Sequence, residues 1–136
     1  MARLLVLDAG AAVWMTVDNV GKGAAVAEIV RGNSLVVPDL FFIECSNVLR
    51  KMAISKQLDL TWDEAQFAVG RIRSLRAKVI SSRALLELVG DNDTVRRIDS
   101  YDGAYAAVAR LIPAPIVTTD QKASFEEAGV ETVIRL

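Results

Sequence analysis

The chain begins with a short apolar run, Leu4–Leu7, which lies between Arg3 and Asp8. A run this short, bounded by charged or turn-forming residues, is typical of a buried strand. Similar short runs recur along the sequence, and longer amphipathic stretches separate most of them. The pattern predicts five strands, at residues 4–7, 34–37, 77–80, 116–117 and 131–134.

The longer stretches carry the spacing and end signals of helices. Thr61–Glu64 reads as a capping box, Gly32 is placed to stop a helix, and Asp39 is predicted to cap the helix that follows it. The helix over 83–89 either pauses there or continues through Thr94–Ile98. The predicted helices cover residues 9–17, 24–31, 40–54, 62–75, 83–89, 102–111 and 121–128.

This alternation of strands and helices predicts an α/β fold with a central, mainly parallel five-stranded sheet flanked by helices. The length of 136 residues suits a single domain spanning 1–136. The composition agrees, because 52% of the residues are apolar but only 6% are aromatic. A core of Val, Leu, Ile and Ala is what parallel sheets prefer.

Four of the 17 acidic residues stand out by their context. Asp8 and Asp120 each follow an apolar strand, so both should lie along one edge of a parallel sheet. Asp102 begins a helix of small residues, and Glu44 lies within an apolar helix. Each Asp alone could simply be a turn or helix-cap residue, whereas Glu44 is harder to explain as structure. We expect these four acids to share one metal site.

The absence of histidine limits the chemistry of such a site. It excludes Ser-His-Asp and Cys-His catalysis and any histidine-ligated zinc. Converging carboxylates favour an oxygen-preferring cation, Mg²⁺ or Mn²⁺, which relieves their repulsion and lowers the pKa of a bound water. The net charge of −1 provides no global attraction to nucleic acid, so a polyanion site must be local.

The single cysteine, Cys45, excludes an internal disulfide and fits a reducing compartment. No uncharged apolar run approaches the ~20 residues needed to cross a bilayer. The N-terminus does not resemble a signal peptide. We therefore expect a cytoplasmic protein with no membrane contact.

Four segments carry a recognisable pattern: Leu5–Asp8, Val37–Arg50, Tyr101–Tyr105 and Val117–Asp120. In this order and spacing they resemble the PIN-domain ribonucleases, and among them the VapC-like toxins of toxin–antitoxin pairs. The resemblance covers essentially the whole chain. It implies a Mg²⁺- or Mn²⁺-dependent endoribonuclease whose catalytic and metal-binding acids are Asp8, Glu44, Asp102 and Asp120.

The resemblance also implies supporting residues. Thr118 resembles the hydroxyl residue of the family two places before the last Asp, and Asn47 matches an Asn one turn after the Glu. The family commonly has Ser or Thr two residues after the first Asp, but Gly10 stands there. We expect the loss of this hydroxyl to lower metal affinity or turnover without removing the site.

The partners implied by the resemblance are an RNA substrate, a cognate antitoxin and a second copy of the chain in a homodimer. The antitoxin would cover part of the apolar surface of the helices around Leu40–Met52 and Leu60–Ile72. RNA binding should rest on local positive charge, for which Lys122 and Arg50 are the candidate contacts.

Other functions stay open at this point. One is a non-toxin or non-catalytic PIN-domain RNA-binding protein. Another is an Asp-dependent phosphatase of the haloacid-dehalogenase type, because that class also begins with an apolar strand that ends in Asp. It normally needs a second Asp two residues later, where Gly10 stands. A receiver-like phospho-acceptor fits less well, since its Asp usually follows a middle strand.

Overall fold

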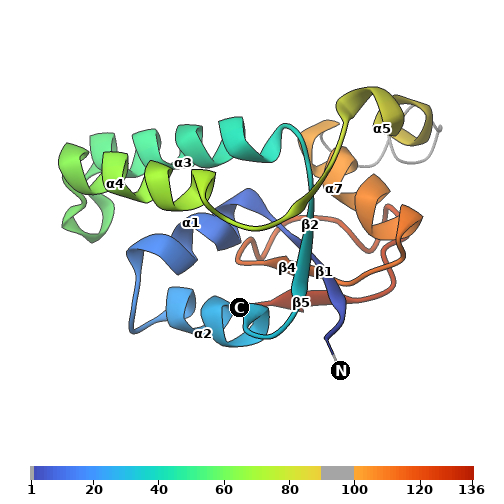
Figure 1. The fold of residues 1–136 in the computed structure, drawn as a ribbon, viewed down its shortest axis with the longest axis horizontal. Coiled ribbons are helices and arrows are strands. Elements are labelled where there is room, and N and C mark those ends of the chain that lie inside the picture. The colour runs from blue at the N-terminus through green and yellow to red at the C-terminus, as the bar shows by residue number, and fades with distance from the viewer. Residues whose placement is uncertain (1, 90–99) are drawn as a thin grey trace.

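The core of the molecule is a five-stranded, fully parallel sheet with the strand order β3-β2-β1-β4-β5 (Figure 1). The computed structural model describes residues 2–89 and 100–136, so the predicted continuation through Thr94–Ile98 lies outside the described residues. The predicted α/β class and five-stranded sheet are confirmed. The strands are β1 (Leu4–Leu7), β2 (Ser34–Pro38), β3 (Lys78–Ile80), β4 (Ile116–Thr118) and β5 (Val133–Arg135).

Helices fill the crossovers that lead from β1 to β2, from β2 to β3 and from β3 to β4, as parallel strand pairs require. A short 3-10 helix, η1 (Gln57–Asp59), separates the two long helices of the second crossover. The helices are α1 (Ala9–Val17), α2 (Lys22–Val30), α3 (Phe41–Ser55), α4 (Trp62–Arg73), α5 (Ser82–Val89) and α7 (Ser100–Leu111).

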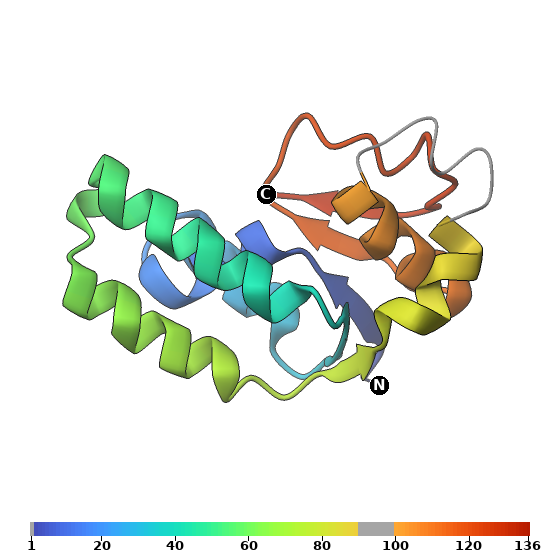
Figure 2. The same ribbon diagram turned by 90° about the horizontal axis from the view of Figure 1, so that it is seen from above.

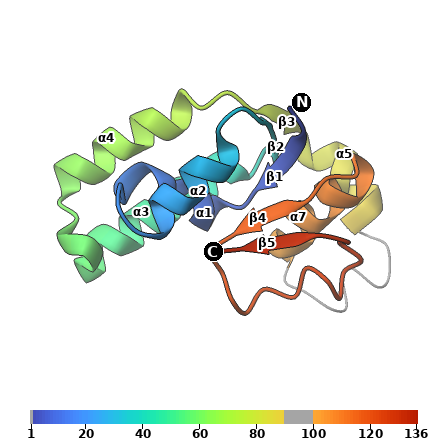
Figure 3. The same ribbon diagram turned by 90° about the horizontal axis from the view of Figure 1, so that it is seen from below.

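The helices form two groups with the strands between them (Figures 2 and 3). Helices α1 to α4 gather on one side, where α3 and α4 run side by side as a hairpin that extends away from the sheet. Helices α5 and α7 lie on the other side, and α7 packs against β1, β2 and β4. Within the described parts of the chain, no helix combines the length and apolar character needed to cross a membrane.

The centre of the sheet is the most deeply buried part of the molecule. Leu5, Val6 and Leu7 of β1 have no exposed surface, and Val36 and Val37 of β2 are equally enclosed. Near-continuous apolar strands of this kind are expected where helices cover both faces of a parallel sheet. The order of the strands reverses at β1, whose neighbours are β2 on one side and β4 on the other. In open parallel sheets this switch point is where ligand sites form.

The predicted helix over 121–128 is wrong, because this segment is a series of turns. The backbone N–H of Ala128 donates to the carbonyl of Phe125 three residues earlier, at 3.1 Å. At the start of the segment, the side chain of Asp120 accepts the N–H of Lys122 at 2.8 Å. This Asx-type turn offers the backbone an alternative to the first helical turn.

Two predicted helix caps have different outcomes. The capping box of α4 is confirmed: Thr61 Oγ1 accepts the Glu64 N–H at 3.1 Å, and Glu64 accepts the Thr61 N–H at 3.2 Å. The prediction that Asp39 caps α3 is wrong, because Leu40 occupies the cap position. The Asp39 carboxylate instead accepts the N–H and the hydroxyl of Ser82. It therefore joins the end of β2 to the start of α5.

Candidate metal centre at the switch point of the sheet

Asp8 and Thr118 meet where the two central neighbours β1 and β4 end. The Asp8 N–H donates to the carbonyl of Val117 at 3.0 Å, which continues the ladder between the strands. The Thr118 Oγ1 hydroxyl, which is fully buried, donates to Asp8 Oδ2 at 2.8 Å. Asp8 precedes α1 but makes no side-chain capping bond to it.

The Thr118 hydroxyl also connects Asp8 to Asp120. Its oxygen accepts the Asp120 N–H at 3.0 Å while its proton is directed to Asp8. The Asp120 side chain is exposed, and it accepts the N–H of Lys122. One buried threonine thus holds the side chain of Asp8 and the backbone of Asp120, so Asp8 and Asp120 lie close together as predicted for the ends of parallel strands.

Electrostatics at Asp8 favour a positive ion. Burial raises the pKa of Asp8, and the nearby negative charge of Asp120 raises it further. The hydrogen bond from Thr118 and the backbone N–H groups of Ala9 and Gly10 oppose this rise but do not cancel it. A buried carboxylate beside a second carboxylate is stabilised when a cation is present.

Glu44 approaches the same place from the first turn of α3. It is partly buried, and its Oε1 atom is shielded from solvent. Burial raises the pKa values of the Cys45 thiol and the Tyr105 hydroxyl, and the charges of Glu44 and Asp8 raise both further. Both carboxylates therefore lie within electrostatic range of Cys45 and Tyr105. The Cys45 thiol lies 3.8 Å from the carbonyl of Ala9, which places α3 beside the start of α1.

Asp102 lies in the first turn of α7, as predicted, and its side chain is partly buried. Helix α7 precedes β4 and runs back across the sheet, so its first turn lies toward the edge at which the strands end (Figure 2). A negative charge in this turn is favoured by the helix dipole. The first turn of α7, which includes Asp102, therefore lies toward the same end of the sheet as Asp8.

The remaining predicted site residues are exposed. Asn47 follows Glu44 by one turn of α3, and Arg50 lies further along the same helix. Lys122 contributes its backbone N–H to the turn at Asp120. Their predicted roles stay predictions.

The described acids fit a hard cation by their chemistry, because carboxylate oxygens are the ligands that Mg²⁺ and Mn²⁺ prefer. Within residues 2–89 and 100–136, however, no three acidic or cysteine side chains are grouped tightly enough to surround an ion. Hydrogen bonds through Thr118 connect Asp8 and Asp120 directly. The charge of Glu44 raises the pKa values of Cys45 and Tyr105, as the charge of Asp8 does.

Sequence reasoning gave no role to Tyr105, which the structure places inside this region. Two signals in the sequence point to it: it closes the Tyr101–Tyr105 segment of the family pattern, and it follows Asp102 by three residues, a spacing that shares a helix face. Gly10 also gains a neighbour: a Cβ atom added there would lie 3.5 Å from Thr119 Oγ1, an ordinary contact distance. A small side chain therefore fits at Gly10.

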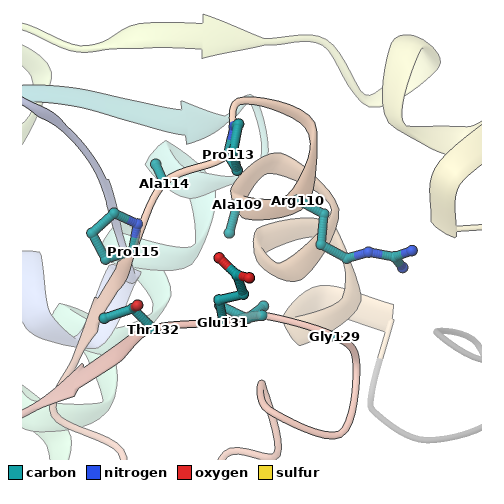
Figure 4. A pocket seen from close by; sticks show the side chains of 9 residues that line it. Ala109, Arg110, Pro113, Ala114, Pro115, Gly129, Glu131 and Thr132 are labelled. Carbon is teal, nitrogen blue, oxygen red and sulfur yellow. The ribbon is translucent and has the colours of Figure 1, made fainter.

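A pocket of about 430 Å³ lies at the opposite end of β4 from Thr118 (Figure 4). Its walls include Pro113 and Pro115 before β4 and Glu131 before β5, and Arg110 extends away from the prolines. None of the predicted site residues lines it. This pocket is therefore separate from the acidic edge of the sheet.

Comparisons with known proteins identify the family. The PIN-domain family model matches residues 5–130, whereas no curated protein matches the sequence significantly. The fold is similar to that of PAE2754 from Pyrobaculum aerophilum, with a TM-score of 0.67 and 23% identity over 98% of this chain and 92% of that one. It is also similar to VapBC2 from Rickettsia felis, solved bound to a DNA fragment from their promoter, with a TM-score of 0.61 and 16% identity over 98% of both chains. Because the family model spans most of the sequence, this chain belongs to the PIN-domain family, whose members are generally nucleases.

Proposed function

We propose that the protein is a Mg²⁺- or Mn²⁺-dependent endoribonuclease and the toxin of a toxin–antitoxin pair. The observation that carries this proposal is the Asp8–Thr118–Asp120 connection at the switch point of the sheet. It supplies a partly buried carboxylate of fixed orientation beside a second, exposed carboxylate. Family membership supports nuclease chemistry, and the absence of histidine from the sequence leaves acidic residues as the source of it.

Four residues would hold the cation: Asp8, Glu44, Asp102 and Asp120. When bound, a divalent cation supplies a water of lowered pKa and stabilises the charge that develops on the phosphate. The part played by the chain is to set the geometry. Thr118 holds one oxygen of Asp8 through its hydroxyl, so the other oxygen remains available as a ligand. Asp120 is exposed and can reach both the ion and solvent.

RNA binding would use positive groups near this edge. The Lys122 N–H donates to the Asp120 side chain, so the Lys122 side chain starts beside the acidic turn. Arg50 extends the positive surface along α3, on which Glu44 also lies. With a net charge of −1, contacts of this local kind are needed to hold a polyanion beside carboxylates.

The partner surface in this proposal is the exposed apolar face of the α3–α4 hairpin. Ile43 and Phe67 are 76% and 71% exposed, and Trp62 is 59% exposed, which is unusual for side chains of this size. Between α3 and α4, a cavity of about 400 Å³ is lined by Phe42, Ser46, Val69, Ile72 and Arg73. An apolar groove with one cation fits an amphipathic peptide with an acidic group. We assign it to the antitoxin, and the adjacent apolar residues to homodimer formation.

The test is RNA degradation by the purified protein, measured with Mn²⁺, with EDTA, and with the Asp8→Asn variant. Cleavage that needs Mn²⁺ and is lost in Asp8→Asn is the expected result. Expression without an antitoxin should also arrest growth of the host. Cleavage in EDTA, or cleavage by Asp8→Asn at the wild-type rate, would show that the carboxylates do not form the catalytic site.

One observation favours a second function, that of a non-catalytic RNA-binding PIN domain. Among the described residues, no three acidic side chains are grouped closely enough to surround an ion. In that case the protein would bind RNA with the same affinity in Mn²⁺ and in EDTA and would cleave it in neither. The same RNA, followed by a gel-shift assay beside the cleavage assay, separates the two functions.

A further inference from the structure

Tyr105 is a residue of α7 that is fully enclosed in the interior. Among the described residues its hydroxyl finds no hydrogen-bond partner of acceptable geometry. Buried tyrosine hydroxyls usually have one, because removing this group from water without replacing its hydrogen bond is unfavourable. Packing of the aromatic ring alone therefore does not explain why a tyrosine, rather than a phenylalanine, occupies this position.

The surroundings of the hydroxyl identify the acceptor that it can serve. Glu44 lies within interaction range on α3, and Asp8 is the second nearby acid, at the end of β1. Burial is the main reason that the pKa of Tyr105 is raised, and these two charges add to it. The phenol therefore keeps its proton. Beside two carboxylates, a protonated phenol acts as a hydrogen-bond donor, and donation to a charged acceptor is stronger than to a neutral one.

The position of Tyr105 on α7 is also fixed relative to the third acid. Asp102 precedes it by three residues, so both lie on one face of the helix. Small buried residues around it, Ala104 and Ala106, allow α7 to pack against β1 and β4. The tyrosine thus stands at the point where α3, α7 and the end of β1 converge.

We propose that Tyr105 is a positioning residue of the carboxylate site: its hydroxyl donates to the Glu44 carboxylate and orients it to share a divalent cation with Asp8. This inference rests on the proposed function. In the cation-free geometry the hydroxyl interacts with the Glu44 side chain, but this contact is not a hydrogen bond of acceptable geometry, so cation binding and the alignment of this hydrogen bond are coupled. Partners of this kind, which hold a metal ligand without touching the metal, typically change metal affinity by about 10–100-fold.

The test compares Tyr105→Phe with the wild type by calorimetric titration with Mn²⁺ and by melting in EDTA. The variant loses only a hydroxyl that makes no hydrogen bond of acceptable geometry, so its melting temperature in EDTA should equal or exceed that of the wild type. Its Mn²⁺ affinity should fall by about 10-fold. Val108→Ala, at an equally buried position of α7, is the matched control: it should lower the melting temperature in EDTA and leave Mn²⁺ affinity unchanged.

A second measurement does not depend on any variant of Tyr105. Addition of Mn²⁺ should shift the near-ultraviolet tyrosine band of the wild type, and Tyr101→Phe should retain this shift because Tyr101 is 60% exposed. Wild-type Mn²⁺ affinity in Tyr105→Phe, or the absence of a tyrosine shift, would overturn the inference. The proposed function would still stand if the wild type binds Mn²⁺ and cleaves RNA. A wild type that binds no Mn²⁺ would overturn both.

Discussion

Thr118 Oγ1 donates a 2.8 Å hydrogen bond to Asp8 Oδ2 across 110 residues of sequence, and the same oxygen accepts the Asp120 N–H at 3.0 Å. The Thr118 hydroxyl thus donates one hydrogen bond and accepts another. This arrangement fixes the orientation of Asp8 relative to Asp120, and the expected effects of several substitutions depend on it.

Thr118→Val should remove both hydrogen bonds while nearly preserving the shape of the side chain. Two buried or partly buried groups would lose their partner, at a cost of about 1–3 kcal/mol to the free energy of unfolding. RNA cleavage and Mn²⁺ affinity should fall together, because Asp8 loses its fixed orientation. Urea unfolding and Mn²⁺ titration measure the two effects.

The control for this change is Thr118→Ser, which keeps the hydroxyl and removes only a methyl group. It should retain Mn²⁺ affinity even if it lowers stability. Equal Mn²⁺ affinity in Val and Ser variants would mean that the hydroxyl does not orient Asp8.

Asp8→Asn should abolish cleavage and yet stabilise the metal-free protein near neutral pH. Because the pKa of Asp8 is raised in the native state, the native protein binds more protons than the unfolded chain between the two pKa values. The stability of the wild type in EDTA should therefore fall as pH rises through the native pKa of Asp8. Asp8→Asn lacks this fall and should melt about 2–4 °C higher for each kcal/mol gained.

Melting curves across pH, with EDTA and with Mn²⁺, check this prediction. Mn²⁺ should raise the melting temperature of the wild type but not of Asp8→Asn, since only the former binds the ion. A metal-free Asp8→Asn protein that melts below the wild type at neutral pH would show that the carboxylate is not under electrostatic stress.

Gly10→Ser should strengthen the site. A Cβ atom at this position meets only Thr119 Oγ1, at 3.5 Å, so the side chain fits without displacing the backbone. Replacing a helical glycine also removes backbone freedom from the unfolded chain, which is worth about 0.5–1 kcal/mol. We expect higher Mn²⁺ affinity and faster RNA cleavage. Gly10→Ala is the matched control, because it gains the stability but not the hydroxyl.

The ion pair between Glu126 and Arg135 should show a pH-dependent effect on stability. Hydrogen bonding to Arg135 is the main reason that the pKa of Glu126 falls to about 2. Its stabilising effect is therefore complete above the ordinary value of 4.5 and is lost as pH falls through about 2. Glu126→Gln should therefore be less stable than the wild type at pH values above about 2 and equally stable below it. The difference in the free energy of unfolding should be small, because the Glu126 carboxylate is half exposed.

Urea unfolding at several pH values, with Glu131→Gln as a control for removal of an exposed acid, measures this effect. A difference between Glu126→Gln and the wild type that stays constant down to pH 2 would indicate that the ion pair is not its cause.

The sequence was sufficient to predict the sheet and the Asp8–Asp120 proximity, because both depend on local signals. Short apolar runs define the strands, and parallel strands bring their ends to one edge. The segment 121–128 was mispredicted because its contacts are not local. Arg135 on β5 donates to Glu126 and to the carbonyl of Ala123, and these bonds favour turns over a helix.

Asp39 and Tyr105 also have roles that depend on non-local contacts, which the sequence alone did not predict. An Asp before a helix normally caps that helix, but here β3 ends beside β2 and Ser82 competes successfully for the carboxylate. Tyr105 was indistinguishable in sequence from an ordinary core aromatic. Its significance depends on the approach of α3 to α7, which only the assembled fold defines.

The position of β1 at the centre of the sheet also sets the order in which the acidic edge can form during synthesis. A ribosome that has translated the chain through α4 has already incorporated Asp8 and Glu44, but not Thr118 and Asp120. The nascent chain therefore carries Asp8 before the strand whose Thr118 orients it exists. Because contacts between distant segments form late, the carboxylate edge is completed only after nearly the whole chain has been translated.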